Sequence, residues 1–415
     1  MKTLLIGMLR KIITSGRLTI VGSDGAVTDI GDMTCSPITL KLHDKWVAFD
    51  LLRDPNLAFG EAYMNGRMTI ENGDIGDLLG LLGRNMGTGI GGGHLWWLAQ
   101  LRTVARHWQR LNTGLRSQKN VAHHYDLSGR LYDLFLDHDK QYSCAFFETE
   151  NDTLEQAQLN KKHRIAAKLA LQPGHRVLDI GSGWGGFGIF LASIAPVDVV
   201  GITLSAEQLK VANGRAASLD MEKRVSFQLL DYRQIKGTFD RVVSVGMLEH
   251  VGVGQYDEYF RSIARLMDED GVALIHSIGR SDGPGVTNPW IAKYIFPGGY
   301  VPALSEVLPA VERSGLIVTD IEILRLHYAR TLAEWRRRFV ANWHRARRLY
   351  DERFCRMWEF YLAGAEMAFR YQGQMVFQMQ LTKRVDALPV ARDYMMPVQV
   401  APVVQDRDSV YGARS

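Results

Sequence analysis

The sequence predicts an α/β fold, in which a mostly parallel sheet with an antiparallel terminal strand follows a small α+β domain. Residues 177–190 carry the main signal, because an apolar run leads into a glycine cluster and then into an apolar pattern at helical spacing. Further strand-like and helical segments alternate downstream, which is typical of a parallel sheet covered by helices. The chain has 415 residues, more than the roughly 250–300 at which a single core stops growing. We therefore expect two domains.

The amino-terminal domain is predicted to span residues 1–86. Residues 1–13 are expected to form an amphipathic helix, because two basic residues interrupt their short apolar core and no small-residue cleavage site follows. Residues 17–85 alternate apolar and polar positions between turn signals such as Asp24-Gly25 and Asn65-Gly66. No cluster of titratable side chains stands out, so we expect this domain to position lipid or to dimerise.

A linker and one helix are predicted over residues 87–119. The stretch at 87–93 contains too much glycine for regular structure and marks a domain boundary. Beyond it, Trp96, Trp97 and Trp108 recur at helical spacing, with arginines on other faces. Two interpretations stay open: tryptophan with arginine suits a membrane interface, and the same tryptophans could instead pack on the second domain.

The second domain is predicted over residues 120–388. A polar and aromatic segment at 120–150 can form a lid, and a helix follows at 154–170. A long apolar helix then precedes the antiparallel strand expected at 374–381, and residues 389–415 are expected to be loosely ordered. The parallel strands are expected near 176–180, 197–202, 224–229, 239–245 and 271–277, with helices between them.

Composition describes an ordinary soluble globular protein, with 46% hydrophobic and 23% charged residues and a formal net charge of +4. No window of about 18 uninterrupted apolar residues is present, so we do not expect the chain to cross a bilayer. The three cysteines are odd in number and far apart, which fits a reducing cytoplasm and predicts neither a disulfide framework nor a metal site. The total charge is too small to indicate nucleic-acid binding.

One basic segment is more informative than the total charge. Aromatic residues alternate there with Arg336, Arg337, Arg338, Arg345, Arg347 and Arg348. Such a segment could contact the phosphates of lipid headgroups or of nucleic acid. The alternative, given equal weight, is a solvated helix face whose arginines pair with Glu334, Asp351 and Glu352.

The glycine cluster at 181–186 predicts a bound nucleoside. Four of its six residues are glycine, so the backbone can turn sharply and a ligand can lie against it. A dinucleotide site would require an acidic residue at the end of the next strand, but that strand ends in Thr203, Leu204 and Ser205. The acid instead precedes the glycines, at Asp179, where a carboxylate suits the ammonium of a methionine moiety and would repel a pyrophosphate. S-adenosylmethionine is therefore favoured over a nicotinamide cofactor.

Ligands of such sheets lie at the carboxyl ends of the strands. This rule selects Asp179, Thr203, Asp231, Glu249 and His276 as candidate site residues. Each also has a simpler interpretation when it is considered alone. A histidine on an apolar strand is usually a core residue, a glutamate after a strand can cap a helix, and an aspartate can start a turn.

Four motifs stand out once these segments are placed: Leu178-Asp-Ile-Gly-Ser-Gly-Trp-Gly-Gly, Val245-Gly-Met-Leu-Glu-His-Val-Gly, His276-Ser-Ile-Gly and Tyr294-Ile-Phe-Pro-Gly-Gly. With these motifs the chain resembles cyclopropane-fatty-acyl-phospholipid synthases and the related mycolic acid cyclopropane synthases. The resemblance covers roughly residues 120–385 and implies a Rossmann-like, class I methyltransferase domain. The amino-terminal part is similar in layout to the bacterial phospholipid enzymes, which carry an extra domain.

The resemblance implies transfer of a methylene group from S-adenosylmethionine to the cis double bond of an acyl chain in a phospholipid. The alkene attacks the sulfonium methyl group, and a base then removes a proton so that the ring can close. In the family this base is a bicarbonate ion, and its cage maps onto the backbone at Cys144 and Ile278 and the side chains of Glu249, His276 and Tyr328. Ring faces for the carbocation could come from Tyr142, Phe147, Tyr294, Phe296 and Tyr328.

The same resemblance assigns donor binding to Tyr142, Ser143, Asp179, Gly181, Gly183, Thr203, Leu204, Gln208, Asp231 and Tyr232. The last two are expected to flank the adenine. The sequence departs from the family at Ser182, where cysteine is common, and at Ser128-Gly129, where Gly-Asn is common. Cys144 is not expected to accept the methyl group, because an alkene can attack the sulfonium directly.

Relatives with nearly the same motifs make other products, so a fatty-acyl C-methyltransferase giving a methyl-branched or methylene product is the alternative. The retained Glu249, His276 and Tyr328 favour proton removal and ring closure. A non-catalytic lipid-binding protein is a third hypothesis. A double bond within a bilayer requires peripheral membrane association, which we expect at the inner face of the cytoplasmic membrane. Similar enzymes with the extra domain are homodimers, and no nucleic-acid partner is expected, because the aromatic segment at 288–300 does not suit one.

Overall fold

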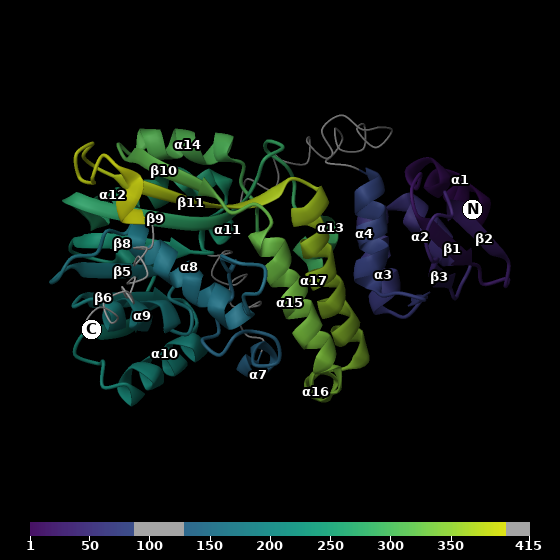
Figure 1. The fold of residues 1–415 in the computed structure, drawn as a ribbon, viewed down its shortest axis with the longest axis horizontal. Helices are drawn as coiled ribbons and strands as arrows, with labels where there is room; N and C mark the ends of the chain where they lie inside the picture. Colours follow the sequence, from purple (N-terminus) through teal and green to yellow (C-terminus); the bar gives the residue numbers. More distant parts are fainter. Residues whose placement is uncertain (87–127, 396–415) are drawn as a thin grey trace, which may run out of the picture.

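The computed structural model describes residues 1–86 and 128–395. The glycine-rich stretch at 87–93, the tryptophan-bearing segment after it and the beginning of the predicted lid lie outside the described residues. Two sheets, one in each predicted domain, stand apart with helices between them (Figure 1). The predicted α/β fold with a preceding small α+β domain is therefore confirmed.

The amino-terminal domain is a four-stranded sheet packed against helices. The strand order is β2-β1-β3-β4, in which β1 and β3 run parallel and the other neighbours antiparallel. Alternate strand residues such as Leu18, Ile20 and Leu40 enter one apolar core, as expected for a sheet buried on one face. The elements are α1 (Lys2–Ile12), β1 (Arg17–Val21), β2 (Val27–Gly31), β3 (Ile38–Leu42), α2 (Trp46–Arg53), α3 (Pro55–Met64), β4 (Met68–Glu71) and α4 (Ile75–Met86).

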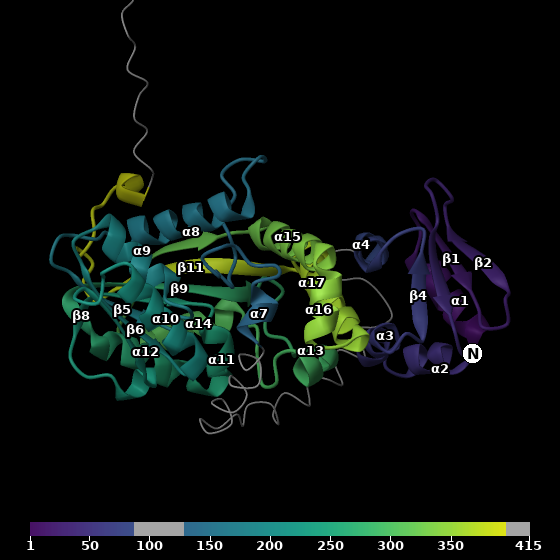
Figure 2. The ribbon, with the colours of Figure 1, turned by 90° about the horizontal axis from the view of Figure 1, so that it is seen from below.

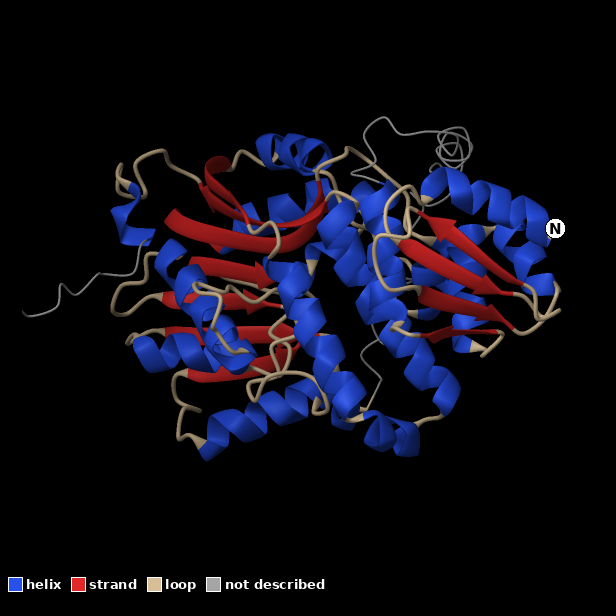
Figure 3. Ribbon diagram, turned by 45° about the vertical axis from the view of Figure 1, so that its right-hand side comes forward, coloured by secondary structure: helices blue, strands red, loops and turns tan. Residues whose placement is uncertain are grey.

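The second domain contains a seven-stranded sheet in the order β10-β11-β9-β8-β5-β6-β7. Figure 3 shows the strands of both sheets in red. Strands β5 to β9 run parallel, and β11 runs antiparallel between β9 and β10. Each strand predicted from the sequence is present, including the antiparallel terminal strand. The strands are β5 (Arg176–Ile180), β6 (Asp198–Thr203), β7 (Val225–Leu229), β8 (Phe239–Val245), β9 (Met267–Arg280), β10 (Ile317–Ile323) and β11 (Gln374–Thr382). Strand β10 was not predicted; it forms the sheet edge and is only partly buried.

Helices cover both faces of this sheet (Figure 2). Apolar residues of α12 and α14 pack on one face, and those of α8, α9 and α10 pack on the other. Helices α15 and α17 pack together between the two sheets. The helices are α7 (Gly129–Tyr132), α8 (Leu154–Lys168), α9 (Gly186–Ile194), α10 (Ala206–Ser218), α11 (Leu248–Val251), α12 (Tyr256–Leu266), α13 (Pro289–Tyr294), α14 (Leu304–Arg313), α15 (His327–Ala341), α16 (Trp343–Leu349) and α17 (Glu352–Tyr371), with short 3₁₀ turns η1 (Tyr232–Gln234), η2 (Val253–Gln255) and η3 (Arg392–Met395).

The tail predicted to be loosely ordered from residue 389 is placed as far as Met395. Turn η3 packs on α8, Arg392 pairs with Asp320 at 2.6 Å, and the Tyr394 hydroxyl donates to Gln380 at 3.1 Å. Side-chain contacts at this point therefore hold the chain against the sheet, which its polar sequence did not predict. Residues 396–415 lie outside the described part.

The basic segment divides into two parts. Arg336 pairs with Asp74, Arg337 with Glu334 and Arg338 with Glu155 and Glu334. The predicted pairing with Glu334 is therefore confirmed for Arg337 and Arg338, whereas Arg336 pairs across to the amino-terminal domain. On α16, Arg345, Arg347 and Arg348 are exposed, and Arg347 lies 3.7 Å from Glu352, as the paired interpretation predicted.

Within residues 1–86 and 128–395, no helix is long and apolar enough to cross a bilayer. The same described residues contain no group of three or more histidine, cysteine, aspartate or glutamate side chains that could hold a metal ion.

Candidate active site

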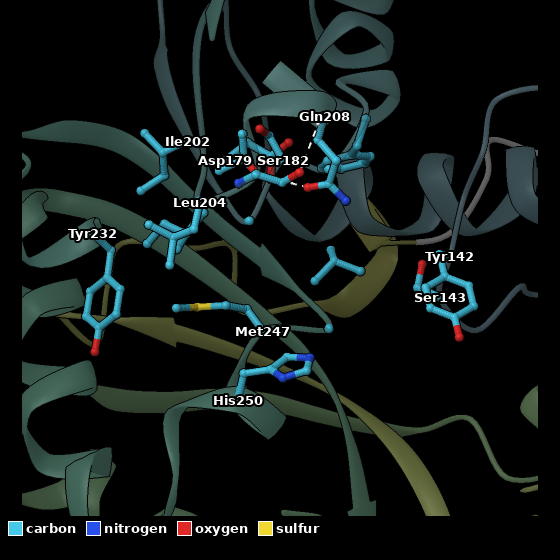
Figure 4. A pocket seen from close by; sticks show the side chains of 18 of the residues that line it. Tyr142, Ser143, Asp179, Ser182, Ile202, Leu204, Gln208, Tyr232, Met247 and His250 are labelled. Atoms are coloured by element: carbon cyan, nitrogen blue, oxygen red, sulfur yellow. Dashed lines mark hydrogen bonds between the residues drawn. The ribbon is translucent and has the colours of Figure 1, made fainter. Parts of the chain in front are cut away.

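A pocket of about 170 Å³ opens at the carboxyl ends of β5, β6 and β8. All ten residues predicted to bind the donor line it. In Figure 4, Tyr142 and Ser143 lie on one side of this pocket and Tyr232 on the other, with Asp179, Ser182 and Gln208 along its top. We call it the donor pocket. Sequence positions separated by about ninety residues thus meet where the topology of a doubly wound sheet places a ligand.

The glycines after β5 leave backbone without side chains along one side of the donor pocket. Gly181, Gly183 and Gly185 have φ angles of +83°, +54° and +80°, a region that L-residues with side chains rarely adopt. A Cβ added at Gly183 would meet no atom within 4 Å, whereas one at Gly185 would lie 2.7 Å from the Phe227 ring. Gly185 therefore allows close packing inside the domain, and Gly183 leaves its backbone open to the pocket.

Asp179 and Ser182 bring two unpartnered polar atoms to this turn. Among the described residues, neither Asp179 Oδ2 nor Ser182 Oγ has a hydrogen-bond partner, although both are buried. Burial raises the pKa of the Asp179 carboxyl to about 7, and the nearby Lys161 ammonium opposes that shift. Buried polar atoms are nearly always satisfied in native structures. The pair therefore fits a ligand that carries hydrogen-bond donors and positive charge, such as the methionine part of S-adenosylmethionine.

The far wall of the donor pocket is held by local hydrogen bonds. Thr203 at the end of β6 donates to Gln208 Oε1 at 2.9 Å, and Ser205 caps α10 by accepting from the Gln208 backbone N–H. Asp231 forms a bidentate pair with Arg233. Asp231 also caps the 3₁₀ turn that carries Tyr232, and this places the tyrosine ring against the pocket.

The loop at 141–144 forms the boundary of the donor pocket and is clamped by two side chains of α8. Gln158 Nε2 donates to the carbonyls of Gln141 and Ser143 at 3.2 and 2.9 Å. The Lys161 ammonium donates to Gln141 Oε1 at 2.6 Å and to Ser143 Oγ at 2.9 Å. Lys161 is buried, and this burial lowers its pKa to about 8. The clamp fixes the backbone on either side of Tyr142.

A second cavity of about 420 Å³ adjoins the donor pocket. Four residues line both spaces: Tyr142, Ser143, Gly246 and His250. All five residues predicted for catalysis line the second cavity: Cys144, Glu249, His276, Ile278 and Tyr328. Its volume lies within the range of about 300–1,000 Å³ usual for small-molecule sites. We call it the acyl cavity.

Glu249 lines the acyl cavity and is held there by the backbone of β9. Its Oε1 accepts a hydrogen bond from the Ile278 N–H at 2.6 Å, and among the described residues its buried Oε2 has no partner. Burial raises the pKa of this carboxyl to about 7. A ligand atom that donates a hydrogen bond to Oε2, or that shares a proton with it, would supply the missing partner.

His276 lies on β9 and is buried. Its Nδ1 is 3.2 Å from the side-chain nitrogen of Gln378 on the neighbouring strand β11. Burial, together with the ammonium groups of Lys161 and Lys168, lowers the pKa of the imidazole well below its usual value. The ring is therefore neutral at pH 7 and can donate one hydrogen bond.

Cys144 is buried, and burial raises the pKa of its thiol well above the usual value. A thiol is a far weaker nucleophile than a thiolate, so this environment does not favour transfer of a methyl group to its sulfur. The expectation that Cys144 contributes through its backbone is compatible with the structure.

The aromatic lining differs from the predicted set. Tyr142, Phe296 and Tyr328 line the acyl cavity, and Phe147 and Tyr294 do not. Phe147 instead lies beneath the Arg330 guanidinium, and Tyr294 donates its hydroxyl proton to Glu61 at 2.7 Å. The rings of Trp290, Phe360, Tyr361 and Phe369 also line the cavity. They belong to an apolar core, and the sequence does not show which of its aromatic residues face the cavity.

Sequence reasoning missed Lys161, Gln158 and Gln378. The two α8 residues lie in a polar segment that reads as a solvent-facing helix, yet the helix is packed between the sheet and the loop at 141–144. Gln378 belongs to a strand with polar residues at alternate positions from 378 to 382, which usually indicates one exposed face. In the structure this face is buried. The polar residues alternating along this strand were the available sequence signal for a buried polar network.

Comparison with known proteins decides the family. The family described as mycolic acid cyclopropane synthetase matches residues 113–379. The chain belongs to this family. A second family, a domain of unknown function, matches residues 7–89. The enzyme thus combines a cyclopropane synthetase domain with an amino-terminal domain that has no assigned role.

Two relatives of this family member differ in the products that their names state. The cyclopropane-fatty-acyl-phospholipid synthase of Escherichia coli K12 is 42% identical over 270 residues, covering 65% of this chain and 69% of the relative. The tuberculostearic acid methyltransferase UfaA1 of Mycobacterium tuberculosis is 34% identical over 401 residues, covering 91% of this chain and 90% of the relative.

The solved structure of the mycolic acid cyclopropane synthase CmaA1 with SAH and CTAB has a TM-score of 0.60 and 34% identity, covering 64% of this chain and 97% of that one. The chain is an enzyme of the S-adenosylmethionine-dependent methyltransferase class, as predicted.

Proposed function

We propose that this family member transfers a methylene group from S-adenosylmethionine to the cis double bond of an acyl chain in a membrane phospholipid. The observation that carries the proposal is the junction of two spaces. One is the donor pocket, with an unpartnered carboxyl oxygen of Asp179 among the described residues, and the other is a larger, mainly apolar cavity lined by Glu249, His276 and Tyr328. An apolar substrate can thus meet a cationic donor at Tyr142 and Ser143, which line both.

The reaction needs an electrophile and a base. When bound, S-adenosylmethionine supplies an electrophilic methyl carbon; Asp179 and Ser182 would hold its methionine part. The π electrons of the alkene form the new C–C bond, the C–S bond breaks with its electron pair on sulfur, and loss of one proton from the transferred carbon closes the ring. Aromatic side chains of the acyl cavity exclude water from the cation and stabilise it through their ring faces.

We propose that bicarbonate, held by the cage of Cys144, Glu249, His276, Ile278 and Tyr328, supplies the base when bound. The unpartnered Oε2 of Glu249 fits the hydroxyl of that ion, because a carboxylate accepts and a bicarbonate hydroxyl donates. The neutral His276 ring and the Tyr328 hydroxyl would donate to its oxygens. A carboxylate beside an anion would repel it without these donors.

A second candidate is a fatty-acyl C-methyltransferase that gives a methyl-branched or methylene product. The similarity to the tuberculostearic acid methyltransferase favours it, because that similarity spans nearly the whole of both chains. The complete set of cage side chains around one cavity favours the cyclopropane product, since ring closure requires proton removal from the transferred carbon.

We also propose that the enzyme is cytoplasmic, works as a homodimer and binds the inner face of the cytoplasmic membrane peripherally. The exposed Arg345 and Arg348 of α16 offer positive charge to anionic headgroups. The homodimer rests on the resemblance to enzymes with the extra domain, and light scattering of the purified protein tests it.

The function is tested by incubating the purified protein with labelled donor and vesicles of a cis-unsaturated phosphatidylglycerol, followed by mass spectrometry of the acyl chains. A gain of about 14 mass units that resists hydrogenation indicates a ring. A product that hydrogenation changes, or a branched saturated chain, would favour the second candidate. Donor binding without any acyl product would contradict both.

A further inference from the structure

One wall of the acyl cavity comes from the amino-terminal domain. Residues of α3 and α4 line the same space as Glu249 and His276: Pro55, Asn56, Phe59, Leu79, Leu82 and Met86. We infer that this domain, which matches a family of unknown function, forms part of the acyl-binding site and selects among acyl chains. The inference deepens the proposed function and rests on it.

The two domains are packed too closely for this wall to be incidental. A Cβ added at Gly83 of α4 would lie 2.4 Å from the ring of Tyr371 on α17, and one at Gly60 of α3 would lie 2.5 Å from Trp290 Nε1. Real Cβ atoms do not approach other atoms so closely, so glycine is required at both positions for helices to meet at these distances. Backbone of the first domain therefore lies directly against helices of the second.

Charged and hydroxyl groups fasten the same interface. Tyr63 donates to Glu359 at 2.6 Å, and the Lys293 ammonium donates to Glu61 at 2.7 Å. Arg336, part of the basic segment, reaches Asp74 at the start of α4 at 2.7 Å. Glu359 is buried, so its bond to Tyr63 lies in a region of low dielectric, where hydrogen bonds are stronger. These contacts fix the wall relative to the cage.

The side chains of this wall indicate which class of ligand the acyl cavity can hold. Phe59, Leu79 and Leu82 present apolar side chains to the cavity, and Leu79 is buried. The cage adds polar groups to the same cavity, and Asn56 adds one amide to the wall. An occupant must therefore be apolar along its length while it presents one reactive group to the cage, as an unsaturated acyl chain does. The distance between wall and cage then limits how much chain fits beyond the double bond.

Photocrosslinking tests the wall without requiring turnover. The full-length protein is irradiated with vesicles of a phosphatidylglycerol that carries a diazirine near the end of its acyl chain, and crosslinked peptides are mapped by mass spectrometry. We expect crosslinks within residues 55–59 and 79–86. Crosslinks confined to the second domain would overturn the inference. They would leave the proposed function intact, because that function is measured by product formation.

Chain selection is tested with variants at Leu82. L82W reduces the cavity and L82A enlarges it, so the ratio of kcat/KM for shorter over longer acyl chains should rise at least about fivefold in L82W and fall in L82A. L52W and L52A are matched controls, because Leu52 is a half-buried leucine of the same domain that does not line the cavity. Unchanged ratios in both folded Leu82 variants would overturn the inference. If wild type gave no acyl product, the proposed function would fail instead.

An independent observation concerns the strand behind the cage. Gln378 is buried on β11, its side-chain nitrogen lies 3.2 Å from His276 Nδ1, and its Oε1 accepts from the Lys168 ammonium at 2.7 Å. Lys168 also pairs with Glu322. A line of side chains thus joins the cage histidine to a carboxylate at the edge strand β10.

The donors and acceptors of this line determine where the histidine proton lies. An ammonium only donates, so the amide oxygen of Gln378 must face Lys168 and its NH₂ must face His276. His276 Nδ1 then accepts and carries no proton. We propose that Gln378 is a positioning residue that holds the neutral ring with its proton on Nε2, so that this nitrogen donates to an oxyanion in the cavity.

Nitrogen NMR of protein labelled in histidine tests this assignment directly. We expect the Nε2–H tautomer for His276 in wild type and loss of that pattern in Q378E, whose carboxylate would draw the proton to Nδ1. Donor affinity should be unchanged, while kcat falls about tenfold or more. Q380L, which alters a buried glutamine two residues along the same face, should keep the wild-type tautomer. An Nδ1–H tautomer in wild type would overturn the assignment, whether or not Q378E folds.

Discussion

The side chain of Glu249 is anchored by the backbone of Ile278. Oε1 accepts the Ile278 N–H at 2.6 Å, and this bond directs the other carboxylate oxygen into a buried position with no partner among the described residues. A buried carboxyl left in this state is costly for folding. The cost is understandable if Oε2 meets the hydroxyl of a bound oxyanion during the reaction.

Replacing Glu249 by glutamine should stabilise the protein at high pH and abolish most activity. Its folded-state pKa of about 7 lies above the usual value of 4.5, so the native state keeps a proton that the unfolded state loses as pH rises. Wild-type stability therefore falls between about pH 4.5 and 7. The free energy of unfolding of E249Q relative to wild type should increase by about 2 kcal/mol from pH 5 to pH 8.

Urea unfolding at both pH values measures this difference. The control is E269Q, which changes an exposed glutamate and should show no such trend. A constant difference between E249Q and wild type across the pH range would contradict the assigned protonation.

Asp179 should make donor binding depend on pH. Its pKa of about 7 in the free protein means that a proton must leave before the carboxylate can pair with the donor ammonium. Donor affinity should therefore rise by up to about tenfold per pH unit below pH 7 and level off above it. In D179N, the affinity should be lower and nearly independent of pH. Calorimetry with S-adenosylhomocysteine checks both, and parallel pH profiles for the two proteins would rule out this role.

Lys161 should control donor affinity through the loop at 141–144. K161M removes the bonds to Gln141 and Ser143 and leaves their acceptors buried without a donor, so donor affinity should fall about tenfold. The adjacent Lys162 pairs with Asp139 instead, so K162M is the matched control with a smaller expected effect. Equal affinities of K161M and wild type would show that the clamp does not shape the pocket.

The exposed arginines of α16 should contribute to membrane binding. The double variant R345E/R348E reverses charge at two exposed positions, and it should sediment less with vesicles that contain phosphatidylglycerol, particularly at low salt. R337E is the control, because this exposed arginine is paired with Glu334 on its own helix. Identical sedimentation of the double variant and wild type would place the membrane contact elsewhere.

Much of the second domain could be predicted because its signals are local. The glycine turn, the apolar strands and the acid before the glycines are each encoded within a few residues. Because ligands lie at the carboxyl ends of parallel strands, the sequence also predicted that Asp179, Thr203 and Asp231 would share one pocket, and they do. Edge strand β10 was missed although five of its seven residues are β-branched, a composition typical of strands.

The remainder of the site depends on contacts between distant segments. Nothing near Leu82 in the sequence indicates that it shares a cavity with Glu249, and the glycines that allow this, such as Gly83, resemble ordinary helix residues. Lys161 and Gln378 read as surface positions because burial of a polar side chain is set by the partner that satisfies it, and those partners lie elsewhere in the chain.

The most direct test of the central claim follows the hydrogens of the transferred carbon. The purified enzyme is supplied with S-adenosylmethionine carrying a trideuterated methyl group and vesicles of a cis-unsaturated phosphatidylglycerol, and the product is analysed by mass spectrometry. Proton removal at the Glu249, His276 and Tyr328 cage predicts a ring whose new carbon retains two of the three deuterons, with little product in E249Q. A product that keeps all three deuterons in a methyl group would contradict ring closure by this cage.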